Sequence, residues 1–128
     1  MYIFPVLILC LVVQCFLGSP LVKPLSAEQS NMVILQGLDK VTARVYRIPL
    51  KFDVPIEFGT LIVTARACEK KPPEEPPEST AFLEIRESID TTDNRLLFSG
   101  WMFASAPGIS ALEHPVYDVW VLDCVVAR

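Results

Sequence analysis

The sequence predicts a single, mainly β domain, built as a small antiparallel β-sandwich or a partly open barrel of about six strands. The chain has 128 residues, enough for one domain with a compact core. Short runs rich in β-branched residues are separated by turn residues, which is the pattern of an all-β fold. Beyond the N-terminal apolar segment, no stretch of about ten residues has a helical period. Two packed sheets or a small barrel fit this spacing of strands.

The first 19 residues are predicted to be a signal peptide. The run Tyr2–Leu17 is uncharged and apolar, but it is shorter than the ~20 residues of a comfortable membrane span. Every charged side chain follows Ser19. We therefore expect a periplasmic or secreted protein whose mature chain starts between about Gly18 and Glu28. An uncleaved anchor in the inner membrane is the alternative, because no Lys or Arg precedes the apolar run.

A proline-containing linker is predicted over residues 20–31, and the β domain over residues 32–126. Six runs predict its strands: Met32–Leu38, Val41–Leu50, Gly59–Cys68, Ala81–Ile89, Arg95–Ala104 and Val116–Val126. In the second run, Val41, Ala43 and Val45 alternate with polar residues. This alternation predicts that these three residues form the buried face of a half-buried strand.

The segment Lys70–Glu78, KKPPEEPPE, is predicted to be a loop. It carries four prolines, which cannot donate to a β-ladder and favour extended polyproline geometry. A stiff, solvated connector is the simpler interpretation. The alternative is a docking segment for the aromatic groove of a partner, based on the PxxP spacing from Pro73 to Pro76.

The four cysteines divide into two pairs. Cys10 and Cys15 belong to the signal segment, which leaves Cys68 and Cys124 in an oxidising compartment, where a disulfide is expected. Two free buried thiols are the alternative. Strict alternation along Gly59–Cys68 places Cys68 on the polar side of its strand, which conflicts with a buried disulfide unless one extra residue forms a β-bulge.

Charge and composition exclude several classes of function. The formal net charge of -4 disfavours nucleic acid as a partner. Lys70 and Lys71 are the only adjacent basic residues, so there is no polybasic patch for anionic lipid, and contact with a membrane is expected only through the N-terminal segment. A single histidine, His114, excludes a multi-histidine metal centre. No nucleotide, zinc-protease or nucleophile-elbow motif is present, so no cofactor and no metal are predicted.

One enzymatic alternative, a periplasmic hydrolase, depends on His114 and nearby carboxylates. His114 would act as a base, oriented by Asp118 or Glu113. A pair of carboxylates across a cleft could also hydrolyse glycosides. The candidates are Glu84, Glu87, Glu113, Asp118 and Asp123. The simpler interpretation is that the His114–Pro115 step sets the turn into the last strand, because the residue before proline is held extended.

The run Leu96–Ala104, LLFSGWMFA, is apolar on both faces. Such a strand is either central in a two-layer fold, or it covers the core with one face and binds a partner with the other. We predict a binding surface near the end of the domain. It would comprise Trp101, Phe103, His114, Tyr117, Asp118 and Trp120. Core packing is the competing interpretation, and for Trp101 it is the stronger of the two.

The chain resembles the bacterial family called Domain of Unknown Function 2155 (DUF2155). The matching blocks are GLDKVTAR (residues 37–44), FGTLIVTARAC (58–68), PPEEPPE (72–78), AFLEI (81–85), FSGWMFAS (98–105) and ALEHPVYDVWVLDC (111–124). The resemblance implies a small, exported bacterial protein, chiefly of Gram-negative organisms, with no activity that can be carried over. The family cysteines match Cys68 and Cys124, which supports their pairing.

A non-catalytic binding or assembly module of the cell envelope is therefore the expected function. The chain lacks a catalytic constellation but has an aromatic-rich apolar strand. An envelope protein or a glycan is the expected partner.

Overall fold

The computed structural model describes residue 18 and residues 29–90 and 94–127. All of the predicted signal segment except Gly18, and most of the predicted linker, therefore lie outside the described residues. Within the described part, no helix is long and apolar enough to cross a membrane.

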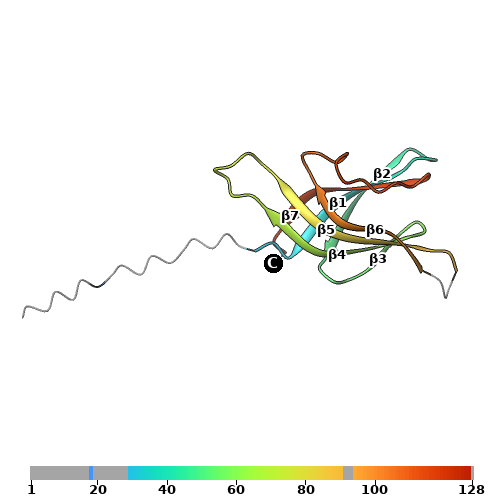
Figure 1. Cartoon of the computed structure of the whole chain (residues 1–128), viewed down its shortest axis with the longest axis horizontal. Coiled ribbons are helices and arrows are strands. Elements are labelled where there is room, and N and C mark those ends of the chain that lie inside the picture. Colours follow the sequence, from blue (N-terminus) through green and yellow to red (C-terminus); the bar gives the residue numbers. More distant parts are fainter. Residues whose placement is uncertain (1–17, 19–28, 91–93, 128) are drawn as a thin grey trace, which may run out of the picture.

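The described chain forms seven antiparallel strands in two sheets (Figure 1). The strands are β1 (Met32–Asp39), β2 (Arg44–Lys51), β3 (Ile56–Phe58), β4 (Leu61–Lys70), β5 (Ser79–Ser88), β6 (Asn94–Phe103) and β7 (Tyr117–Val125). One sheet has the order β2-β1-β7, and the other has the order β3-β4-β5-β6. The predicted sandwich is confirmed, and it is not closed into a barrel. The strand that the sequence did not reveal is β3, whose three residues are too few to show alternation.

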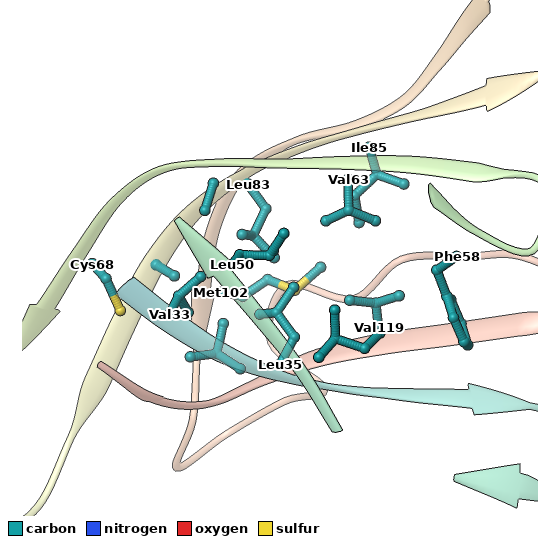
Figure 2. Close-up of a cluster of buried hydrophobic side chains, with 14 of the residues drawn as sticks. Val33, Leu35, Leu50, Phe58, Val63, Cys68, Leu83, Ile85, Met102 and Val119 are labelled. Atoms are coloured by element: carbon teal, nitrogen blue, oxygen red, sulfur yellow. The ribbon is translucent and has the colours of Figure 1, made fainter. Parts of the chain in front are cut away.

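The core lies between the inner faces of the two sheets (Figure 2). Its fully buried large side chains are Val33, Leu35, Leu50, Leu61, Val63, Leu83, Ile85, Met102 and Val121. Each side chain of this size contributes ~1.5–3 kcal/mol when buried. Leu112, from the connection between β6 and β7, also packs into this core, so that the connection is held against the sandwich.

The second strand begins later than predicted, and its buried face is the opposite one. The Asp39 side chain accepts hydrogen bonds from the backbone N–H groups of Val41 and Thr42, which closes a tight turn over residues 40–43. Val41 is 77% exposed in that turn, and Val45 is 58% exposed. The pairing of β2 with β1 instead turns Ile48 and Leu50 into the core. The register of the pair therefore decides the buried face, not the identity of the β-branched residues.

A β-bulge in the strand containing Cys68 resolves the conflict between strict alternation and a buried disulfide. The pairing of β4 with β5 shifts between Ala65 and Ala67, so that Arg66 is the extra residue. Ala65 and Cys68 both face the core as a result. Cys68 forms a disulfide with Cys124 of β7, with 5.6 Å between the two Cα atoms. The disulfide joins the two sheets, and Figure 2 shows Cys68 at the opposite end of the core from Phe58.

Among the strands that the structure describes, the apolar strand β6 lies at the edge of its sheet and pairs with β5 alone. It is thus not a central strand, and only one of its faces covers the core. Met102 points inward and is 2% exposed, while Trp101 points outward and is 39% exposed. The two apolar faces seen in the sequence therefore have different surroundings.

Candidate functional site

The structure places the six predicted binding residues in three separate regions. Trp101 and Phe103 lie on the outer face of the four-stranded sheet, and Asp118 and Trp120 lie on the outer face of the three-stranded sheet. The pairings across each sheet fix these faces, because Phe82 is opposite Trp101 and Gln36 is opposite Trp120. The other two residues, His114 and Tyr117, form part of one end of the sandwich. The six residues therefore do not form one continuous surface.

The outer aromatic face consists of Phe82, Trp101 and Phe103, on β5 and β6. Phe82 packs edge-on against Trp101, with 5.4 Å between the ring centroids. None of the three residues belongs to the buried core cluster, so core packing does not explain Trp101. The contact with Phe82 restricts the Trp101 ring while one side of it stays exposed to solvent.

A network of charges lies beside this aromatic face. The β4 bulge turns Arg66 outward, where its guanidinium donates to Asp53 at 2.8 Å and to Glu84 at 3.2 Å. The hydrogen bond to Asp53, and next the one to Glu84, raise the pKa of Arg66. One inserted residue therefore has two effects, since it buries Cys68 and also presents a fixed guanidinium on the outer face.

Sequence reasoning missed Phe82 and Arg66. The signal for Phe82 was present, because Ala81, Leu83 and Ile85 alternate with Phe82 and place it on the opposite, polar side of β5. No signal identified the position of the bulge at Arg66, because a one-residue bulge depends on how β4 pairs with its neighbour.

A row of rings fills the sandwich end opposite the disulfide. Phe58 contacts Tyr46 at 5.5 Å and Tyr117 at 5.3 Å between centroids, and Tyr117 lies 5.4 Å from the imidazole ring of His114. Gly59 makes room for the row, since a Cβ atom there would lie 2.2 Å from the Cζ atom of Tyr117. These rings join both sheets to the connection that precedes β7.

Both ring nitrogens of His114 are engaged within the fold. Nδ1 accepts hydrogen bonds from the backbone N–H groups of Val116 and Tyr117, at 3.0 and 3.1 Å. Nε2 contacts the carboxylate of Glu87. This pattern assigns the neutral tautomer with its proton on Nε2, donated to Glu87. The geometry matches the simpler interpretation, in which His114 fixes the turn into β7, and it leaves no free lone pair for a substrate proton.

Four of the five carboxylates proposed for catalysis are engaged with other groups. Glu84 pairs with Arg66, and Glu87 contacts His114. Asp118 pairs with Lys40 at 3.5 Å rather than with His114. Asp123 pairs with Lys70 at 2.9 Å and accepts a hydrogen bond from the Ser79 hydroxyl. Glu113 is exposed.

No group of three or more potential metal ligands occurs among residues 18, 29–90 and 94–127.

The proline-rich segment is a loop, as predicted, and connects β4 with β5 (Figure 1). It is anchored at both ends. The Lys71 N–H donates to the Glu78 carbonyl oxygen, and the Glu78 carboxylate accepts hydrogen bonds from the backbone N–H and the hydroxyl of Ser105. The Ser105 hydroxyl bond, followed by the Ser105 backbone bond, lowers the pKa of Glu78. Two shallow grooves of about 800 and 450 Å³ flank the loop, and Pro72 and Pro73 line both.

We expect the attachment of this loop to weaken in acid. A carboxylate with a lowered pKa in the folded state stabilises the fold above its ordinary pKa, here 4.5, and loses this contribution as the pH falls through the folded value. Replacing Glu78 with Gln should therefore lower stability at neutral pH and have a smaller effect in strong acid. Urea unfolding at a series of pH values measures this difference.

Glu75→Gln is the matched control, because the Glu75 side chain is exposed and its backbone N–H alone bonds within the loop. An equal pH profile for the two variants would contradict the role assigned to Glu78.

The region that matches known proteins has nearly the same bounds as the β domain of the structure. A family model described as "Uncharacterized protein conserved in bacteria (DUF2155)" matches residues 33–124, nearly all of the span from β1 to β7. The chain belongs to the DUF2155 family. A relative from Rickettsia prowazekii (strain Madrid E), "Uncharacterized protein RP359", is 32% identical over 88 residues. The match covers 69% of this chain and 57% of the relative, so the chain spans little more than half of that protein. No solved structure matches this chain significantly.

The matched region contains both cysteines of the disulfide and all three residues of the outer aromatic face. The DUF2155 description assigns no activity to this region, so function has to be argued from the chemistry of its surface.

Proposed function

We propose that this DUF2155 chain is a non-catalytic binding or assembly module of the cell envelope, and that it binds through the outer aromatic face. The observation that carries the proposal is Trp101, an amphipathic ring that is 39% exposed and packed edge-on against Phe82. Rings held in this way bury a large area on binding at a low entropic cost, which is why Trp is enriched in the energetic centres of interfaces.

Export to the envelope is part of the proposal. The apolar, uncharged start of the sequence supports it, because charged residues occur only after Ser19. The disulfide between Cys68 and Cys124 fits an oxidising compartment such as the periplasm. A cleaved signal with a periplasmic or secreted product is the favoured form, and an uncleaved inner-membrane anchor is the alternative form.

A binding role is favoured over hydrolysis by the state of His114. A general base needs a lone pair that can reach a substrate, and both nitrogens of this imidazole face groups of the protein itself. The aromatic face, in contrast, has its rings directed outward and needs no rearrangement to meet a partner.

Replacing Trp101 with alanine tests the proposal. We expect the variant to lose partners that cross-link to the tagged wild-type chain in the envelope fraction, with a cost in stability of about 1 kcal/mol from the lost contact with Phe82. Quantitative mass spectrometry of the captured proteins and glycans, together with urea unfolding, provides the measurement.

Trp120→Ala is the matched control, since Trp120 is half-buried on the outer face of the other sheet. Equal capture by the wild-type chain and the Trp101 variant would count against the outer aromatic face as the binding surface.

A further inference from the structure

The sheet edges of this protein are not equally protected against another strand. On the β2 edge, Arg44, Arg47 and Lys51 are charged and Pro49 lacks an N–H group, while the β3 edge has only three residues. Charged residues, proline and short strands are the devices by which proteins block pairing at an edge. The edge strand β7 carries two aspartates and is joined to β4 through the disulfide.

The β6 edge has none of these devices over most of its length. From Leu96 to Phe103 there is no charged residue and no proline. Leu97 forms a β-bulge where the pairing with β5 shifts, and from Phe98 to Phe103 the pairing is regular. In the part of the chain that the structure describes, β6 pairs with β5 alone. A long, uncharged edge strand of this kind is a template for a further strand.

The hydrogen-bonding pattern identifies the backbone groups that are available. The Ala104 N–H donates to the Ser79 carbonyl at 2.9 Å, so this position bonds towards β5. Bonding towards the partner strand alternates along an antiparallel pair. The N–H and C=O groups of Ser99 and Trp101 and the N–H group of Phe103 therefore point away from β5, at the open edge. The Phe103 carbonyl accepts a hydrogen bond from the Ala106 N–H at 3.3 Å. The same three residues place their side chains on the outer face of the sheet.

We propose that the β6 edge binds an extended segment of a partner polypeptide, which adds a strand to the four-stranded sheet. This inference rests on the proposed binding function and names its mode and partner. The main-chain groups of Ser99 and Trp101 and the N–H group of Phe103 supply the hydrogen bonds, and every second side chain of the added strand packs beside the Trp101 and Phe103 rings. Free main-chain groups at an open edge favour a polypeptide over a glycan, because only a polypeptide strand pairs with them in register.

Charges at one end of β6 indicate what the partner carries. Arg86, which is opposite Leu96 on the outer face, and Arg95, at the start of β6, are exposed and have no ion pair among the described residues. Glu87, the residue opposite Arg95, is already in contact with His114. The added strand therefore carries a carboxylate at the end that lies beside these two arginines.

A second copy of this chain would offer these arginines only a carboxylate that already accepts three hydrogen bonds. Antiparallel pairing of two β6 strands about their middle would bring Arg95 beside Ser105 of the other copy, where the Glu78 carboxylate is already bonded to Ser105. Each copy also carries a formal net charge of -4, so two copies repel each other at long range. The partner is thus a different polypeptide.

The test uses a synthetic peptide of alternating Val and Thr residues with Asp at its C-terminal end and both termini blocked. It is added to the disulfide-bonded protein, and amide hydrogen exchange is followed by NMR. We expect slower exchange at the amides of Ser99, Trp101 and Phe103, and no change at the β2 edge.

Ser99→Pro removes an N–H group that points outward from the edge strand, where proline is tolerated, and it should weaken binding of the peptide about tenfold or more. Ser99→Ala, which keeps that N–H, should bind like wild type.

A second probe does not depend on the folding of the proline variant. The same peptide, N-methylated at the residues that would donate to β6, should not bind, and exchanging its Asp for Lys should weaken binding several-fold. The proposal would be overturned if the N-methylated peptide bound as well as the unmodified one, or if exchange at the three amides did not slow.

A wild-type dimer that Ser99→Pro dissociates would assign the edge to a second copy instead. If strand addition fails while Trp101→Ala still abolishes envelope capture, the binding function stands and only its mode is wrong.

Discussion

Replacing Cys68 and Cys124 together with alanine should lower the free energy of unfolding by about 4 kcal/mol. The disulfide spans a sequence separation of 56 residues, and closing a loop of that length removes a large part of the chain entropy of the unfolded state. It also joins β4 to β7, and hence one sheet to the other, at the opposite end of the core from Phe58. Small domains of this size bury limited apolar area and depend on such links.

Urea unfolding of the double variant, and of wild type with and without a reducing agent, measures this contribution. The reduced wild type is the control, because it lacks the cross-link but keeps both side chains. Alkylation of protein taken from its native compartment, without reduction, reports whether the bond forms there. Two free thiols in that protein would refute both the disulfide and the part of the export proposal that depends on it.

Replacing Gly59 with alanine should destabilise the domain by about 3 kcal/mol. Gly59 has a φ of +58°, where a residue with a Cβ atom costs ~1–2 kcal/mol. The new Cβ atom would also lie 2.2 Å from Tyr117 Cζ and 2.3 Å from its hydroxyl oxygen. Because Tyr117 is held between Phe58 and His114, the ring cannot move without disturbing the end of the sandwich.

Gly108→Ala is the matched control, since a Cβ atom there would meet nothing within 4 Å and its φ is not positive. A double-mutant cycle with Tyr117→Ala separates the two causes. The backbone cost should persist in the Tyr117→Ala background, whereas the steric cost should vanish. Equal stability of the Gly59 and Gly108 variants would show that the aromatic row is not tightly packed.

The pattern of the sequence was sufficient to predict the type of fold and the proline-rich loop. Alternation in Gly59–Cys68 predicts that Leu61, Val63, Ala65 and Ala67 share the apolar face. The first three are fully buried, but Ala67 follows the bulge and is not part of the core. Alternation failed in β2, where Tyr46, Ile48 and Leu50 share the inward-facing side instead of Val41, Ala43 and Val45. The two possible buried faces of this strand are offset by one residue along the chain. Only the pairing with β1 determines which of the two faces is buried.

For the candidate site, the sequence identified Trp101 and Phe103 as unusual but could not determine their neighbours. Phe82 lies 19 positions before Trp101 and meets it only because β5 and β6 pair in that register. Likewise, His114 was grouped with Glu113 and Asp118 because they are close in sequence. Its partner is Glu87, which is 27 residues away. Proximity along the chain is a poor guide to side-chain partners in a sheet protein, because most contacts are made between strands.

By itself, the sequence determined that this protein is a small β domain with two cysteines available for pairing and with an apolar strand near its end. These features depend on local composition and on a period of two residues, which a single chain segment carries. Three features follow from the tertiary structure instead: β6 is an edge strand, Arg66 forms a bulge, and Trp101 and Trp120 face opposite sides of the sandwich. Each of these depends on which strands become neighbours and in what register, and that choice is made by the packing of the whole core rather than by any one strand.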